Sequence, residues 1–322
     1  MDPFSRVRSY YIQGAPTRVV IDLIKQCPDW SELAFQERIV SECINHPLIQ
    51  KNGHVQDYEC PFVRKYFDML MLKDVYIADS LAQEYDRIHN HAAEEGEYHF
   101  CYYPIPERNE ALQIRLKRSS NCTAFKTWEA CFAFMEWILD HKEAFRGKRV
   151  LELGAGSGLC GQMLQCVVRD CQVTMSDYCD EVVEYILGNV EESCSYSPPS
   201  NVDSVVFQEM GIEPPSVATV DFCNPNEMEL ARLAPQVIIA TDITFSPDLV
   251  DGLVAMLDLC FSAHSLETAF ICCTIRTEEL FNRFKSGMEK KYRIVEHELE
   301  QKNIWYYFKY ARIVLLEISK SP

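Results

Sequence analysis

The chain has 322 residues, of which 48% are apolar and 25% charged, enough for one large domain or two smaller ones with buried cores. Its formal net charge of −17 opposes contact with a nucleic-acid backbone, and no apolar run approaches the ~20 residues of a membrane span. The fifteen cysteines include no Cys-x-x-Cys pair, and the first residues lack an apolar signal core. We therefore expect reduced thiols, no metal site, no membrane or nucleic-acid partner, and a cytoplasmic protein.

The first 97 residues carry a helical pattern. Apolar side chains recur at i, i+3, i+4 and i+7 from Val20 to Cys27, and again from Val63 to Met71. Pro61 precedes the second run and suits the first turn of a helix. A polar stretch at 89–97 then interrupts the periodicity. We predict a helical N-terminal region at residues 1–97, which either helps to hold a large substrate or completes a core, and a second domain at residues 98–322.

Strands and helices alternate after residue 100. The first five predicted strands are 149–153, 172–176, 217–220, 236–241 and 269–274. Their alternation with helical segments predicts a mostly parallel sheet with helices on both faces. Two further strands, 292–299 and 311–318, are too close in sequence for a crossover helix and should pair as an antiparallel hairpin. The fold class is therefore α/β, with a seven-stranded sheet that ends in an antiparallel hairpin.

The segment from Val150 to Gly158 joins an apolar strand to a glycine-spaced turn. Glycine lacks Cβ, so it permits φ > 0 and close approach of a ligand to the backbone. The residues from Gly156 to Gly161 also fit the Gly-x-Gly-x-x-Gly pattern of a dinucleotide site. However, the carboxylate of Glu152, two residues before Gly154, would repel a pyrophosphate. It suits a ligand without phosphates, such as S-adenosylmethionine, whose amino group it could bind.

Acidic residues follow three of the other predicted strands. Asp177 ends the second strand, where an acid takes the ribose hydroxyls of a nucleoside cofactor, or caps the next helix. Asp221 and Phe222 follow the third strand and either flank an adenine ring or form a surface turn. Asp242 ends the fourth strand and lies at the mouth of the crevice, or caps the helix that follows. The carboxyl ends of the strands are therefore the predicted site.

These motifs together resemble methyltransferase family 16 of the class I protein-lysine methyltransferases. The segments that carry the resemblance are 127–130, 150–158, 176–177, 221–222 and 242–245. The resemblance implies a Rossmann-like sheet, S-adenosylmethionine as cofactor, and methyl transfer to a protein lysine. It is most specific to the members that act on eukaryotic elongation factor 2, and it implies that factor as the protein partner and up to three methyl groups on one lysine.

The resemblance also implies roles for single residues. Asp242 and Phe245 would shape the entrance for the lysine, with Asp242 orienting its amine. Phe222 stands where relatives usually carry Trp, and it would stack on adenine. Together with the loop residues, the predicted cofactor contacts are Trp128, Glu152, Gly154, Ala155, Gly156, Gly158, Asp177, Phe222 and Thr241.

Two other classes of function stay open at this point. The first is a methyltransferase for another protein or for a small molecule. The second is an NAD-binding oxidoreductase or an inactive binding module, although no further domain follows the sheet to hold a hydride acceptor. The sequence does not specify the oligomeric state.

Overall fold

The structure is a computed structural model, which describes residues 3–52, 56–90, 98–108, 111–117, 123–168, 170–195, 207, 211–263 and 265–321. These residues form two compact units. The first unit runs to Ser119 and also includes Ile304–Tyr306, whereas the second unit begins at Ser120 and contains the seven-stranded sheet. Within the described ranges no helix is long and apolar enough to cross a bilayer, and the thirteen described cysteines are free.

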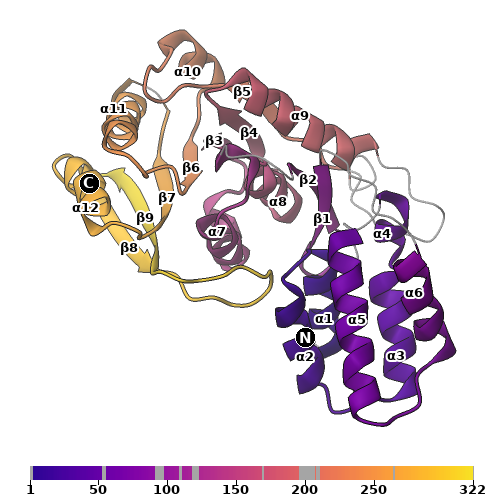
Figure 1. Ribbon diagram of the computed structural model, residues 1–322. Helices are drawn as coiled ribbons and strands as arrows, with labels where there is room; N and C mark the ends of the chain where they lie inside the picture. Colours follow the sequence, from indigo (N-terminus) through magenta and orange to yellow (C-terminus); the bar gives the residue numbers. More distant parts are fainter. Residues whose placement is uncertain are drawn as a thin grey trace. The chain divides into compact units, whose positions relative to one another are not determined.

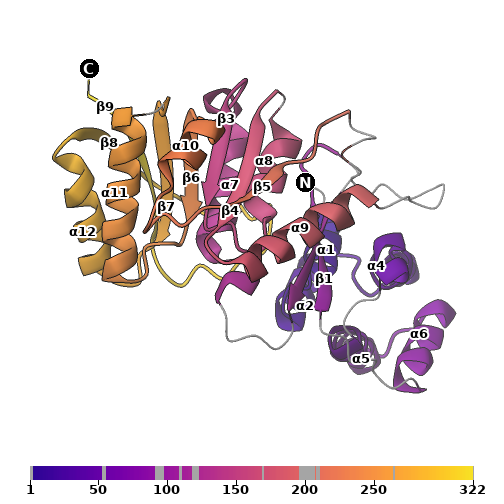
Figure 2. The same cartoon turned by 90° about the horizontal axis from the view of Figure 1, so that it is seen from above.

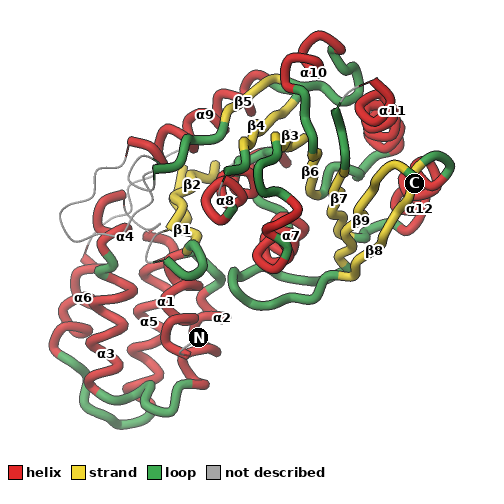
Figure 3. Tube along the Cα trace, turned by 180° about the vertical axis from the view of Figure 1, so that it is seen from behind, coloured by secondary structure: helices red, strands yellow, loops and turns green. Residues whose placement is uncertain are grey.

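The first unit is mainly helical (Figure 3). Its helices are α1 Pro3–Ile12, α2 Thr17–Gln26, α3 Leu33–Ile39, α4 Pro47–Asn52, α5 Gln56–Leu72 and α6 Asp79–Asn90. The amphipathic spacing in α2 buries Val20 and Ile24, as the sequence predicts. Pro61 lies inside α5 rather than in its first turn, because this helix already begins at Gln56. The helix therefore lacks one backbone hydrogen bond at that point.

A two-stranded hairpin extends the first unit beyond residue 97, the boundary that the sequence suggested. Strands β1 (Tyr98–Pro104) and β2 (Ala111–Lys117) pair antiparallel. The fully buried indole of Trp305 donates a hydrogen bond to the carbonyl oxygen of Pro104 at 3.0 Å, and so ties residues 304–306 to this unit. Most of the predicted polar stretch, residues 91–97, lies outside the described residues.

The second unit is built on a seven-stranded sheet (Figure 1). Its strands are β3 Arg149–Leu153, β4 Gln172–Asp177, β5 Ser216–Thr219, β6 Val237–Thr241, β7 Thr268–Thr274, β8 Tyr292–Glu298 and β9 Ile313–Lys320. The spatial order is β5-β4-β3-β6-β7-β9-β8. Strand β9 is antiparallel to both β7 and β8, and the pairs among β3 to β7 are parallel. The predicted fold class and its terminal antiparallel hairpin are therefore confirmed.

Helices cover both faces of this sheet (Figure 2). They are α7 Glu129–Asp140, α8 Leu159–Val167, α9 Asp180–Ser195, α10 Glu227–Leu233, α11 Pro247–Ala263 and α12 Glu278–Glu289. Ile271 of β7 belongs to the core that α11 and α12 cover. The neighbouring Phe270 instead packs against Trp137 of α7, with ring centroids 5.3 Å apart. This alternation places α7 and the α11–α12 pair on opposite faces.

The parallel strands bring their carboxyl ends to one edge of the sheet. Leu153, Asp177, Thr241 and Thr274 end β3, β4, β6 and β7, respectively. The loops that follow these residues therefore meet at the same edge, where ligands of open α/β sheets bind.

Candidate functional site

The loop after β3 has a backbone that only glycine fits. Gly154 adopts φ = +63°, and a Cβ on it would lie 2.6 Å from Cγ2 of Ile243. Gly156 adopts φ = +54°, and a Cβ there would lie 2.8 Å from the carbonyl oxygen of Ala124. Both the left-handed conformation and the close neighbours exclude a side chain at these positions.

The end of β4 holds this loop in place. The amide of Ala155 donates to the carbonyl oxygen of Ser176 at 2.9 Å. The amide of Gly156 donates to Oδ2 of Asp177 at 3.3 Å, and Oδ1 accepts from the amide of Tyr178 at 2.9 Å. Burial raises the pKa of the Asp177 carboxyl above its ordinary value, although these amides lower it.

A cavity of about 300 Å³ opens beside the glycine loop. Ten of the eleven predicted site residues line it: Trp128, Glu152, Gly154, Ala155, Gly156, Asp177, Phe222, Thr241, Asp242 and Phe245. Gly158 is not among the lining residues; it precedes α8 with φ = +74°, a conformation that itself favours glycine. The structure thus gathers residues from five segments of the chain around one cavity.

Glu152 is the most unusual of these lining residues. Glu152 is only 2% exposed, and its Oε2 has no hydrogen-bond partner among the described residues. Burial raises the pKa of this carboxyl to about 8, and the nearby charge of Asp177 adds to the effect. This oxygen points toward α8, since a Cβ on Gly161 would lie 2.5 Å from it, so it is packed against that helix while Glu152 as a whole lines the cavity.

The two adjacent residues after β5, to which the sequence analysis gave one shared role, have different surroundings in the structure. Phe222 is 7% exposed; it packs in the core under α11 and lines the cavity. Asp221 instead closes a turn, where its Oδ1 accepts from the amide of Cys223 at 2.9 Å. Only the aromatic ring therefore faces the cavity, and Asp221 has the alternative role of a turn residue.

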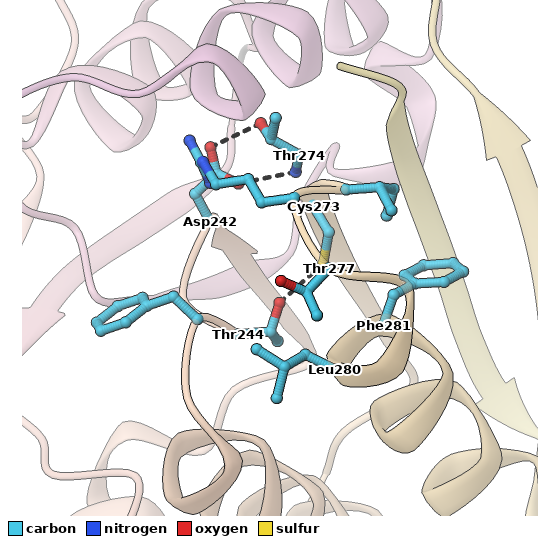
Figure 4. Close-up of a pocket in the computed structure, with 10 residues that line it drawn as sticks. Asp242, Thr244, Cys273, Thr274, Thr277, Leu280 and Phe281 are labelled. Atoms are coloured by element: carbon cyan, nitrogen blue, oxygen red, sulfur yellow. Dashed lines mark hydrogen bonds and ion pairs between the residues drawn. The ribbon is translucent and has the colours of Figure 1, made fainter. Parts of the chain in front are cut away.

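Asp242 follows β6 in a left-handed conformation, with φ = +56°. Its side chain is 3% exposed and accepts hydrogen bonds from four groups. Oδ1 accepts from the amide of Thr274 at 2.7 Å and from Nη1 of Arg276 at 3.2 Å. Oδ2 accepts from the hydroxyl of Thr274 at 2.9 Å and from the amide of Ala130 at 3.3 Å. Figure 4 shows the two bonds to Thr274. A carboxylate has about four acceptor sites, so an amine can bind here only by replacing a donor.

Arg276 is the functional candidate that the sequence reasoning missed. It lies two residues after β7, lines the same cavity, and pairs with Asp242 and with Glu129, whose Oε2 lies 3.0 Å from Nη2. Its position after the carboxyl end of a central strand is the signal that could have identified it. Its partners lie 34 and 147 residues away in sequence, so its charge pairing was not visible in the sequence.

A second cavity, of about 160 Å³, also has Asp242 in its lining (Figure 4). Asp242, Phe245 and Arg276 line both cavities. The remaining lining residues of the second cavity come from the loop after β6, the end of β7, the loop after β7 and the start of α12: Thr244, Cys273, Thr274, Ile275, Thr277, Leu280 and Phe281. The ring of Phe245 is 59% exposed, so it stands at the rim rather than in the core.

Within the described part of the chain, no group of three or more His, Cys, Asp or Glu side chains is arranged to hold a metal ion.

Comparison with known proteins shows which family this chain is similar to. A sequence model of the family described as lysine methyltransferase matches residues 106–291. Protein-lysine N-methyltransferase EEF2KMT of Bos taurus is 25% identical over 264 residues, which cover 78% of this chain and 76% of the relative. Putative protein N-methyltransferase FAM86B1 of Homo sapiens is 28% identical over 53% of this chain, and the match spans about half, 51%, of that relative. Among solved structures, a SAM-dependent methyltransferase from Agrobacterium tumefaciens gives a TM-score of 0.45 at 14% identity, over 72% of each chain.

Proposed function

Because the chain belongs to the lysine methyltransferase family, we propose that it methylates a lysine of eukaryotic elongation factor 2. The enzyme is a methyltransferase whose cofactor is S-adenosylmethionine. The observation that carries the proposal is the joining of the glycine loop and the Asp242 segment around one cavity, in a chain whose bovine and mouse relatives are both named protein-lysine N-methyltransferase EEF2KMT.

The extent of these matches supports elongation factor 2 over a different protein. The mouse relative matches over 82% of this chain, more than the second unit alone contains, so the similarity extends into the helical first unit. A relative with a different name, the calmodulin-lysine N-methyltransferase of Arabidopsis thaliana, matches over only 43%. We propose that the first unit contributes to recognition of the protein substrate.

The cavity residues fit the cofactor. Gly154, Gly156 and Glu152 line its wall, and Glu152 would bind the amino group of the methionine part of the cofactor, which carries no phosphate. Asp177 would hold the ribose hydroxyls, and Phe222 would lie against the adenine. Trp128, Ala155 and Thr241 complete the wall. When bound, the cofactor supplies a methyl group already activated by its sulfonium, so the protein chiefly positions and desolvates the acceptor.

The acceptor lysine must lose its proton before it can attack. The ordinary pKa of a lysine is about 10.4, and a partly apolar site lowers it. The exposed ring of Phe245 and the indole of Trp128 offer apolar surface at the rim and wall of the cavity. The same rings would favour a methylated ammonium through cation–π contact, which suits successive methylations. Asp242 would orient the amine through one of its oxygens.

The test is tritium transfer from labelled S-adenosylmethionine in two parallel assays, one with purified, unmethylated elongation factor 2 and one with a cell lysate. We expect label on a single lysine of that factor, identified by mass spectrometry. Label in other lysate proteins but not in elongation factor 2 would contradict the proposed substrate, and label in small molecules alone would contradict a protein substrate.

A matched pair of glycine variants connects this activity to the cavity. Gly156 has φ = +54° and Gly147 has φ = +68°, but a Cβ on Gly147 meets no atom within 4 Å. Backbone strain is therefore similar in the two alanine variants. Gly156→Ala should lose cofactor binding in calorimetry and transfer with it, whereas Gly147→Ala should keep both. Equal losses of cofactor binding in the two variants would show that backbone strain alone explains the effect. The contact of the new Cβ with Ala124 beside the cavity would then have no part in it.

A further inference from the structure

We propose that Arg276 occupies the position that the ammonium group of the substrate lysine takes during turnover, so that substrate binding exchanges one cation for another. This inference rests on the proposed lysine methyltransfer and identifies how the same site recognises its acceptor. It goes further because it assigns Arg276, a residue of the protein itself, as a gate between the two cavities.

The groups around the Arg276 guanidinium form a cage for an organic cation. Two carboxylates pair with it, Asp242 at 3.2 Å and Glu129 at 3.0 Å. Two aromatic rings face it, with the guanidinium carbon 5.1 Å from the ring centroid of Trp128 and 5.7 Å from that of Tyr310. The hydroxyl of Tyr310 also accepts a hydrogen bond from Nε. Carboxylates and aromatic faces together are the groups that bind ammonium ions, including methylated ones.

The arginine at the centre of the cage lines both cavities. Arg276, Asp242 and Phe245 are the residues shared by the linings of the cofactor cavity and of the second cavity. The two cavities therefore adjoin at these three residues. A lysine side chain that reached the cofactor cavity by way of the second cavity would meet Arg276.

Arg276 is also the replaceable partner of Asp242. The Arg276 side chain is 33% exposed, whereas that of Asp242 is 3% exposed. The other three donors to Asp242 belong to Thr274 and Ala130, and two of them are backbone amides fixed by β7 and α7. Departure of Arg276 leaves these three bonds intact and frees one acceptor site on Oδ1. An incoming ammonium fills that site without any rearrangement of the buried carboxylate.

The exchange predicts that removal of Arg276 opens the cage to a free cation. The probe is tetramethylammonium chloride, and the reporter is the indole N–H resonance of Trp128 in NMR spectra of the full chain, assigned with Trp128→Phe. In Arg276→Ala this resonance should shift on titration and saturate, with an apparent affinity about tenfold higher than in the unsubstituted protein. Sodium chloride at equal concentration should not reproduce the shift.

Two other variants separate cage occupancy from structural damage. Arg276→Lys keeps a cation in the cage and should respond like the unsubstituted protein. Arg276→Gln retains most of the length without the charge and should respond like Arg276→Ala if the alanine variant folds poorly. Arg283→Ala is the matched control and should change nothing, because it removes an exposed arginine of α12 that pairs with Asp251 of α11.

The inference is overturned if the Trp128 resonance of folded Arg276→Ala or Arg276→Gln ignores tetramethylammonium, or shifts as it does in the unsubstituted protein. This binding measurement needs no substrate and no turnover. Absence of methyl transfer to elongation factor 2 would therefore count against the proposed function alone, whereas an unresponsive cage would count against the gate alone.

Discussion

Asp242 joins three segments of the chain, because its four donors come from the start of α7, the end of β7 and the loop after it. The sequence predicts a carboxylate that orients the acceptor amine, and the structure adds that this carboxylate also holds Thr274 and Arg276 at the cavity. Loss of the whole carboxyl group would leave buried donors unpaired, at a cost of about 3 kcal/mol or more. Asp242→Ala therefore mixes a folding effect with a catalytic one.

Asp242→Asn is the sharper test of the orienting role. The amide keeps the size of the side chain and one acceptor oxygen, so we expect the variant to fold and to bind S-adenosylmethionine. Transfer should fall by roughly 100-fold, because a misplaced acceptor loses the alignment on which the displacement depends. Calorimetry measures cofactor binding and tritium incorporation measures transfer. Unchanged transfer, or loss of cofactor binding in a folded variant, would refute the assigned role.

Glu152 gives the protein a specific pH dependence of stability. Its pKa is about 8 in the folded chain and near its ordinary value of 4.5 in the unfolded chain. Between these two values the folded state binds more protons than the unfolded state, so the free energy of unfolding falls as the pH rises, and the fall ends above about pH 8. A glutamine side chain cannot titrate, so Glu152→Gln should lose less stability over this range, by an amount on the order of a few kcal/mol.

Denaturant unfolding of both proteins at several pH values measures this difference. The relevant quantity is the gap between the two stability curves, because every other titrating group contributes to both. We expect the gap to widen in favour of Glu152→Gln as the pH rises. Parallel curves would mean that Glu152 is ionised in the folded protein.

At the scale of elements, the second unit was predictable because its strands and helices follow local rules. The apolar run of β6 predicted a buried strand, and the short connection between β8 and β9 predicted a hairpin. The acids and glycines after β3, β4 and β6 were predictable for the same reason, since carboxyl ends of parallel strands meet at one edge. Asp221 could not be separated from Phe222 this way, because both follow the same strand and only the turn geometry decides between them.

Pairings between distant segments set the limit of the sequence reasoning. The hairpin of β1 and β2 belongs to the first unit, although its strand pattern resembles that of the sheet-forming region. Arg276 escaped notice because its two carboxylate partners come from α7 and from the end of β6. Neither fact depends on a local pattern, and both required the three-dimensional arrangement.

At the scale of the whole molecule, the surface of the first unit offers a test of the role proposed for that unit. Three large apolar side chains are exposed at the end of α5 and just after it: Met71 at 60%, Leu72 at 89% and Tyr76 at 70%. Between them, Lys73 lies over the ring of Trp30 at 4.7 Å and donates to the hydroxyl of Ser31. Contiguous exposed apolar patches mark surfaces that contact other proteins, so these three neighbours in sequence are the candidate contact surface to test.

If the first unit holds the protein substrate, a charge on this surface should weaken binding of that substrate alone. We expect Leu72→Asp to raise the KM for elongation factor 2 about tenfold, since a well-placed interface residue contributes over 1 kcal/mol, and to leave kcat and cofactor affinity unchanged. Met228→Asp is the matched control, because Met228 is 84% exposed on α10 of the second unit. An equal rise in KM for both variants would assign the effect to the added negative charge itself. Such a charge would act on the substrate wherever it stands on this acidic chain. No rise for Leu72→Asp would leave the first unit with the other role considered for it, completion of a core.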